Sequence, residues 1–414
     1  MKMFYKKSLL TLMCSTALLL SACNDDDDKD EYSSGKTYQS ELNYSQDTLA
    51  EASSIKVMTY LMPNVQGKNA KATAMVMFPK TPKPENGWRV VIWAHGTTGI
   101  GDSCAPSNNP FNERFEILAN SLLKEGYVVV APDYEGLGTS GIHPYLNLSS
   151  AAKSATYAVD AVQEKYGKDL NKSWMSIGQS QGGHASLAIA EFANANADYK
   201  GAVATAPASS LGYIITQVAP LAIAQIAAGE KTGAYPPGAS IAVYSELLAY
   251  AAYTGVGIRA YDPQFNLSTI FEDGAKLIAE KAEGTTGDNG QCLQPLMNEF
   301  MTDIGTFLAK NTDKTILDYP GLKDGFEKDP VVAKFLVDNQ PATKKLNKPL
   351  YVVQGQLDTA VPYQVTQGLV QQLNALGTTP PAILDIVEGA GHTQAIVQKN
   401  TEVVAFVKKH MPAR

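Results

Sequence analysis

The sequence contains few of the residues that bind metals, with four cysteines and five histidines among 414 residues. None of them stand at zinc-site spacing, so we expect no metal site. An internal repeat is also missing, which argues against repeat architectures. Lysine and arginine form no stripe and the net charge is −7, so nucleic acid is not an expected partner. What remains is an ordinary globular composition, in a chain long enough for one large core and an inserted or appended second one.

The first residues have the features of an export signal. Three lysines lie within residues 2–7, and the apolar stretch that follows, residues 8–20, is too short to span a bilayer comfortably. Residues 20–23 (LSAC) resemble a bacterial lipobox, in which the cysteine is lipidated and becomes the first mature residue. We therefore predict a lipoprotein signal peptide over residues 1–22 and lipidation of Cys23. An ordinary signal peptide cut at nearly the same place, or a short anchor, is the alternative.

A lipid on Cys23 predicts a protein of the cell envelope, anchored on the periplasmic side of a membrane or at the cell surface. The acidic run that follows, residues 24–31 (NDDDDKDE), cannot bury apolar area. We predict that residues 23–50 form a flexible acidic tether between the lipid anchor and the folded domain.

Export changes what the cysteines can do. Cys14 leaves with the signal peptide and Cys23 carries the lipid, so Cys104 and Cys292 remain. Two remaining cysteines in an oxidising compartment suggest a disulfide. Two separate buried thiols are the alternative, because the sequence does not show that the two residues are close together.

Short apolar runs without alternation indicate strands that are covered on both faces, as in a parallel sheet. Amphipathic helical patterns separate several of these runs, so the predicted fold class is α/β, with a mostly parallel, doubly wound sheet. The runs are residues 90–94, 127–131, 174–177, 202–205 and 350–353.

The alternation of strands and helices stops near Leu211 and resumes near Lys348. Residues 211–347 contain apolar helical stretches, which we interpret as a helical cap inserted over the carboxyl end of the sheet. Residues 51–210 then form the first part of the core, and residues 348–414 form the second. The alternative is that the extra helices pack on the rear of the sheet.

A Gly-x-Ser-x-Gly motif stands between a predicted strand, residues 174–177, and a predicted helix, residues 184–194. In this context the motif predicts a nucleophile elbow, a tight turn that exposes Ser180 at the top of the sheet. Gly178 and Gly182 are required there because strand and helix pass so closely that a β-carbon would clash.

A serine hydroxyl becomes a nucleophile when a base takes its proton and a third group orients the base. His392 comes after the predicted last strand, residues 382–387, and Asp358 comes after the strand at residues 350–353. Like Ser180, each therefore follows the carboxyl end of a strand, where open α/β sheets build their sites. We predict a catalytic triad of Ser180, Asp358 and His392.

Acyl transfer also requires donors for the oxyanion. The backbone N–H of Gln181, next to the nucleophile, is one predicted donor, and Thr97 in the loop at residues 95–99 is the other. His95 precedes the serine, and we interpret it as a support of that loop rather than as the base. His184, one turn beyond the elbow, is expected to pack against or brace its helix.

These motifs together resemble the α/β-hydrolases and, more narrowly, the secretory lipase family, which includes fungal lipases and bacterial esterases. The order Ser, Asp, His along the chain is that of α/β-hydrolases. The resemblance implies ester hydrolysis through an acyl-enzyme, no cofactor, and a helical lid inserted before the acid residue. In some fungal members an acidic side chain lines the oxyanion loop, whereas residues 96–99 here are Gly-Thr-Thr-Gly. The stretches that carry the resemblance are residues 95–99, 131–138, 143–145, 178–184, 354–362 and 389–392.

The sequence thus favours a serine ester hydrolase, a lipase or esterase, acting on a small-molecule or lipid ester and attached to a membrane by its N-terminal lipid. A serine peptidase of the same fold is the second hypothesis, since the same triad cleaves amides. A surface lipoprotein without catalysis is the third. Neither the natural ester nor the oligomeric state can be predicted from the sequence.

Overall fold

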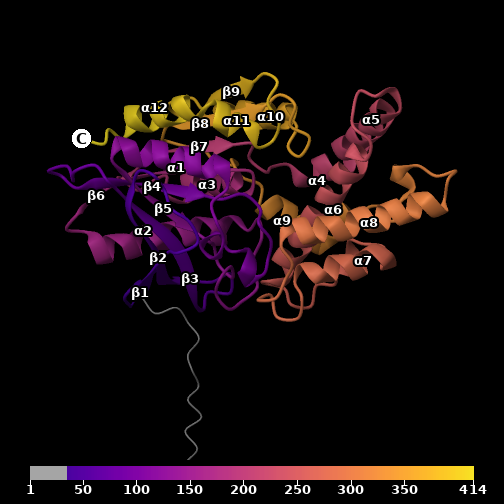
Figure 1. Cartoon of the computed structure of the whole chain (residues 1–414), viewed down its shortest axis with the longest axis horizontal. Coiled ribbons are helices and arrows are strands. Elements are labelled where there is room, and N and C mark those ends of the chain that lie inside the picture. Colours follow the sequence, from indigo (N-terminus) through magenta and orange to yellow (C-terminus); the bar gives the residue numbers. More distant parts are fainter. Residues whose placement is uncertain (1–34) are drawn as a thin grey trace, which may run out of the picture.

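The computed structural model describes residues 35–414, in which nine strands form one sheet in the order β1-β2-β3-β5-β4-β6-β7-β8-β9 (Figure 1). Neighbouring strands from β5 to β9 run parallel, and β1, β2 and β3 are antiparallel additions at one edge. The α/β fold class with a mostly parallel sheet is therefore confirmed. The strands are β1 (Tyr38–Asn43), β2 (Ala52–Pro63), β3 (Asn69–Pro79), β4 (Trp88–Ala94), β5 (Tyr127–Pro132), β6 (Leu170–Gln179), β7 (Tyr199–Thr205), β8 (Leu350–Gly355) and β9 (Ile383–Val387).

Helices cover both faces of the sheet, because its central strands are apolar on both sides. On one face α2, α3 and α10 pack against β-strand residues such as Val90 and Val128, and on the other α1, α11 and α12 pack against residues such as Val91 and Val129. These helices are α1 (Glu113–Glu125), α2 (Leu148–Tyr166), α3 (Gln181–Phe192), α10 (Tyr363–Ala375), α11 (Gln394–Gln398) and α12 (Asn400–His410).

The predicted tether over residues 23–50 is wrong in its C-terminal part. Residues 38–43 form β1, which pairs with β2, and the backbone N–H groups of Thr37 and Tyr38 donate hydrogen bonds to the Glu164 carboxylate. As an edge strand with one neighbour, β1 is mostly polar and shows no apolar run. The predicted signal peptide and Cys23 lie outside the described residues.

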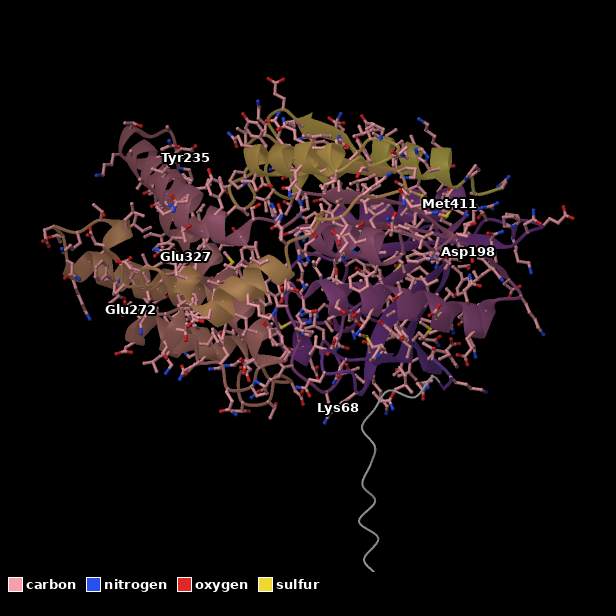
Figure 2. The ribbon with its side chains drawn as sticks, turned by 180° about the vertical axis from the view of Figure 1, so that it is seen from behind. Lys68, Asp198, Tyr235, Glu272, Glu327 and Met411 are labelled. Atoms are coloured by element: carbon pink, nitrogen blue, oxygen red, sulfur yellow. A yellow bond between two sulfur atoms is a disulfide. The ribbon has the colours of Figure 1, made fainter. Side chains whose placement is uncertain are left out.

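Residues 211–347 leave the sheet after β7 and return to it at β8. They form a separate helical layer around the buried side chains of Tyr253, Phe271 and Phe300. Figure 1 shows this layer beside the sheet, and from behind Tyr235, Glu272 and Glu327 lie on it, away from Asp198 and Met411 (Figure 2). We call this layer the cap; its helices are α4 (Leu211–Tyr213), α5 (Ala219–Thr232), α6 (Ala239–Arg259), α7 (Asp273–Ala279), α8 (Leu293–Lys310) and α9 (Pro330–Asp338).

Candidate active site

The turn from β6 into α3 holds Ser180 in a backbone conformation that L-residues rarely adopt, with φ 61° and ψ −118°. The glycines on either side make this turn sterically possible. A β-carbon at Gly178 would lie 1.9 Å from the carbonyl oxygen of Gly182, and one at Gly182 would lie 1.8 Å from that of Ala94. The serine therefore sits on a turn of the nucleophile-elbow type, with an exposed fraction of 9%.

Three residues from three strand ends meet at this serine. Nε2 of His392 lies 2.8 Å from Oγ of Ser180, and Nδ1 of His392 lies 2.8 Å from Oδ2 of Asp358. Because a carboxylate only accepts, the proton of the neutral ring is on Nδ1, which leaves Nε2 free to accept the serine proton. The structure thus brings together the three residues predicted as a triad, in the geometry that proton transfer from the serine requires.

The Asp358 carboxylate is held by donors besides His392. The backbone N–H groups of Ala360 and Val361 donate to Oδ1, at 2.9 and 2.8 Å, and the side-chain amide of Gln354 donates to Oδ2 at 2.8 Å. Four hydrogen bonds therefore fix the carboxylate in the described structure. Sequence reasoning missed Gln354, because a single polar residue at the end of a buried strand gives no signal of its own.

The glycine-containing loop after β4 runs directly past the serine. A β-carbon at Gly96 would lie 3.0 Å from the side-chain oxygen and 3.2 Å from the carbonyl oxygen of Gln179, and 3.6 Å from Cβ of Ser180, so the glycine lets the loop pass close to the elbow. Thr97 hydrogen-bonds through its hydroxyl to the hydroxyl of Tyr145, at 2.7 Å. Within residues 35–414, the backbone N–H groups of Thr97 and Gln181 have no hydrogen-bond acceptor, as the oxyanion role predicted for them requires.

The other predicted histidines have structural partners. The ring nitrogens of His95 lie 2.7 Å from the carbonyl oxygen of Gly96 and 3.1 Å from that of Asp133, so the ring supports the loop. Burial lowers the pKa of His95. His184 lies 3.0 Å from the carbonyl oxygen of Asn339, next to cap helix α9, and burial lowers its pKa to about 4. Both rings are therefore neutral at pH 7.

His143 joins the elbow to the loop that follows β5. Its Nδ1–H donates to the carbonyl oxygen of Glu135 at 2.8 Å, and its Nε2 accepts from the side-chain amide of Gln181 at 2.9 Å. Burial lowers the pKa of His143 to about 3, so it is a neutral brace. The side chain of Gln181 is thus held by His143, while its backbone N–H has no acceptor within residues 35–414.

A disulfide joins Cys104 to Cys292, with the Cα atoms 5.3 Å apart. It ties the segment after the oxyanion loop to the start of cap helix α8. An isolated bridge between Gly99 and Cys292 and a hydrogen bond from the Leu293 N–H to the Thr98 carbonyl oxygen strengthen the connection. The cap is therefore fixed close to the candidate oxyanion loop.

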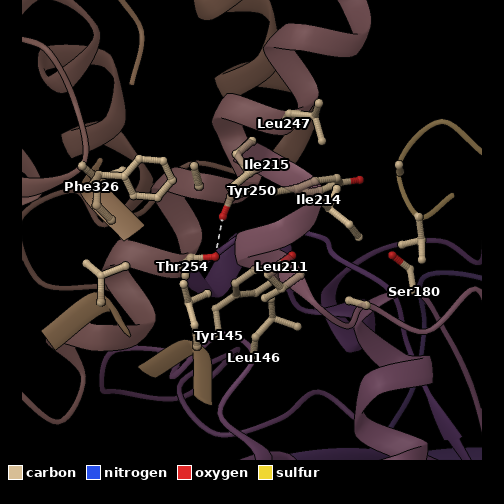
Figure 3. A pocket seen from close by; sticks show the side chains of 17 residues that line it. Tyr145, Leu146, Ser180, Leu211, Ile214, Ile215, Leu247, Tyr250, Thr254 and Phe326 are labelled. Carbon is tan, nitrogen blue, oxygen red and sulfur yellow. Dashed lines mark hydrogen bonds between the residues drawn. The ribbon is translucent and has the colours of Figure 1, made fainter. Parts of the chain in front are cut away.

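An apolar cavity extends from Ser180 into the cap (Figure 3). We call it the cap cavity; its volume is about 90 Å³. Ser180 lies at one edge of it in Figure 3, and Phe326 lies across it. No Asp, Glu, Lys or Arg lines this cavity in the part of the chain that the structure describes; its walls include Tyr145, Leu211, Ile214, Leu247, Tyr250 and Leu336. In residues 35–414, moreover, no group of three His, Cys, Asp or Glu side chains could hold a metal ion.

Comparison with solved structures gives the same architecture over nearly the whole chain. The rice cell wall degrading esterase LipA from Xanthomonas oryzae is 17% identical, with a TM-score of 0.64 over 92% of this chain and 99% of that one. A closed-state lipase A from Candida antarctica is 14% identical, with a TM-score of 0.62 over 91% and 82% of the two chains. A putative hydrolase from Legionella pneumophila is 17% identical, with a TM-score of 0.66 over 90% and 98%.

The chain has the α/β-hydrolase fold. The family model described as serine aminopeptidase, S33, matches residues 111–235, which include the elbow and end before the acid and the histidine. Curated proteins gave no match. Ser180, Asp358 and His392 follow β6, β8 and β9 of this chain, in the order nucleophile, acid, histidine that α/β-hydrolases have.

Proposed function

We propose that this α/β-hydrolase cleaves carboxylic esters through an acyl-enzyme on Ser180. The observation that carries the proposal is the hydrogen-bonded series Asp358, His392, Ser180 at the edge of an apolar cavity. Two of the similar structures are named as an esterase and a lipase, which supports the same chemistry.

In the first half of the reaction, Oγ of Ser180 attacks the ester carbonyl carbon while Nε2 of His392 takes its proton. The N–H groups of Gln181 and Thr97 donate to the oxyanion that forms. As the C–O bond breaks, the imidazolium returns the proton to the leaving alcohol. Water then attacks the acyl-enzyme, with His392 again as the base, and releases the carboxylic acid. Asp358 keeps the ring oriented and stabilises its charged form.

The acyl chain is assigned to the cap cavity, because the cavity contains Ser180 and is almost entirely apolar. Burial of each methylene there contributes about 0.8 kcal/mol. An ester with an aliphatic acyl part fits such walls, whereas a charged acyl part does not.

Hydrolysis of peptides is the second candidate, since the matching family model carries the name of an aminopeptidase. An aminopeptidase has to bind the ammonium group of its substrate, and among the described residues the cap cavity has no carboxylate in its lining. This difference favours esters. A competition assay in which a peptide p-nitroanilide outcompetes p-nitrophenyl butyrate would reverse the preference.

The direct test compares wild-type protein with Ser180→Ala on p-nitrophenyl esters of increasing acyl length. We expect Ser180→Ala to lose hydrolysis by a factor on the order of 10⁴ or more. Ser45→Ala, the same change at an exposed position, serves as the control and should match the wild type. A folded Ser180→Ala protein that turns over esters normally contradicts the proposal. Failure of a fluorophosphonate probe to label Ser180 would favour a non-catalytic surface protein.

We propose further that the protein acts outside the cytoplasm, anchored by a lipid on Cys23. The signal sequence supports this, and a disulfide between Cys104 and Cys292 suits an oxidising compartment. Replacement of Cys23 by Ala is expected to move the protein from the membrane to the soluble envelope fraction. Unchanged membrane association of that variant would show that another element holds it there.

A further inference from the structure

Arg114 stands out because its guanidinium, which is partly buried, has no hydrogen-bond or ion-pair partner among the described residues. It lies in the first turn of α1, and its Nε is buried without a hydrogen bond. Within residues 35–414, none of the ion pairs, hydrogen bonds or cation–π contacts involves its side chain. By contrast, Arg259 pairs with Glu283 at 2.8 Å, and Arg89 donates to the Ala413 carbonyl oxygen at 2.8 Å. Burial also lowers the pKa of Arg114. A guanidinium binds carboxylates through parallel charged hydrogen bonds, so an unpaired one beside a cavity is a suitable site for a negative ligand.

The position of Arg114 connects this cation to the candidate active site. It lines a cavity of about 280 Å³, which we call the loop cavity, together with His95, Gly96 and Thr98 of the oxyanion loop. It also lines a surface pocket of about 290 Å³ with Glu113, Thr393 and Gln394, the last two of which directly follow His392. Gly96 lines the loop cavity, and a β-carbon on it would lie 3.6 Å from Cβ of Ser180. The backbone of the oxyanion loop therefore lies between this cavity and the nucleophile.

The walls of the loop cavity suit an anion on a flat, apolar body. Trp93, Phe111 and Phe115 contribute aromatic surface, and no acidic residue lines the cavity in the described part of the chain. Thr98 lies in the same wall, and its hydroxyl is buried without a partner. A carboxylate could accept from this hydroxyl and from the guanidinium together, which satisfies two groups that the protein itself leaves unsatisfied.

We propose that Arg114 binds an anionic group on the alcohol part of the ester substrate. This inference rests on the proposed ester hydrolysis. The acyl part is assigned to the cap cavity, whereas the leaving alcohol receives its proton from His392, whose neighbours share a pocket with Arg114. When the C–O bond breaks, the alcohol takes the proton of the His392 imidazolium and leaves with its own carboxylate intact. No other reactant is needed.

The test uses two esters that differ in one charge, 4-carboxyphenyl butyrate and 4-carbamoylphenyl butyrate. We expect Arg114→Gln to raise the KM of the carboxyphenyl ester about 10-fold or more and to change that of the carbamoyl ester less than about 2-fold. Arg114→Lys should keep part of the preference, and Arg89→Gln is the matched control. Thermal unfolding of each variant checks that the fold is retained. Equal effects on both esters, or none, overturn the proposal.

Two further measurements separate this proposal from the proposed function. Calorimetric titration with 4-hydroxybenzoate reports the anion site without turnover, and Arg114→Gln should weaken this binding about 10-fold. If that binding depends on Arg114 while no ester is cleaved, the ester chemistry fails and the anion site stands. If esters are cleaved but binding does not depend on Arg114, the anion site fails. A larger Arg114 effect on a hemisuccinate ester, which has its charge on the acyl part, overturns the assignment to the alcohol.

Discussion

The side-chain amide of Gln354 donates to the same oxygen of Asp358, Oδ2, that faces the His392 ring, in each case at 2.8 Å. Thr366 in turn donates to the amide oxygen of Gln354 at 2.7 Å, which fixes the direction of the amide. Gln354 is fully buried. The hydrogen bond from Gln354 explains how Asp358, which lies on a loop, is kept in position to accept from His392, which follows another strand.

Replacement of Gln354 by Leu should therefore lower kcat with little change in KM, because Asp358 loses a donor and the ring loses its orientation. A hydrogen bond to a charged group contributes about 1.5–3 kcal/mol, so we expect a loss of roughly 10- to 100-fold. Steady-state kinetics on p-nitrophenyl butyrate measures both constants. Thr366→Val should cause a smaller loss of the same kind. An unchanged kcat in Gln354→Leu would show that the two backbone N–H groups suffice.

His143 predicts a pH dependence of stability. Burial lowers its folded-state pKa to about 3, from an unfolded value of about 6.5, so the neutral ring stabilises the fold fully above pH 6.5. This contribution is lost as the pH falls from 6.5 towards 3. The free energy of unfolding of the wild type minus that of His143→Gln should fall by roughly 2–3 kcal/mol between pH 6.5 and 4.5. Urea denaturation of both proteins measures it. The pKa of His184 is lowered as well, but this residue is present in both proteins, so its contribution cancels in the difference. A difference in free energy of unfolding that stays constant with pH would contradict the argument.

Ile215 and Phe326 separate the cap cavity from a second cavity of about 370 Å³ in the cap, since both residues line both spaces. Phe326→Ala should join the two cavities and extend the space for an acyl chain. On the proposed function, the ratio of activity on p-nitrophenyl dodecanoate to that on butyrate should rise by about 4-fold for each further methylene that the joined space buries. Phe307→Ala, another aromatic truncation in the cap, is the control. An unchanged chain-length profile would place the acyl chain elsewhere.

The disulfide is expected to contribute to stability, because it links residues 188 positions apart and connects the cap to the sheet domain. The double variant Cys104→Ser, Cys292→Ser should lose about 2–5 kcal/mol. Thermal unfolding with and without a reductant measures the effect. The reductant should lower the midpoint of the wild type but leave that of the double variant unchanged. A wild type insensitive to reductant while its thiols are shown to be free would contradict the prediction.

The sequence was sufficient for the fold class and for the three residues that meet at the site, since each follows an apolar strand and parallel strands end at one edge. It did not reveal β1, because an edge strand of polar residues lacks an apolar pattern. Nor did it reveal Gln354 or Arg114. A buried amide and a partly buried guanidinium differ from solvated ones only through contacts between distant segments, as when Arg114 shares a pocket with Gln394.

The cap leaves the sheet after β7 and returns at β8, and these two strands are neighbours, with Thr205 paired to Val353. An insertion whose two ends lie side by side behaves as a replaceable module. Evolution or design can exchange residues 211–347 for a cap of another shape while the scaffold under the nucleophile stays as it is. The Cys104–Cys292 bond is the one covalent cross-link that such an exchange would have to rebuild or discard within the described residues.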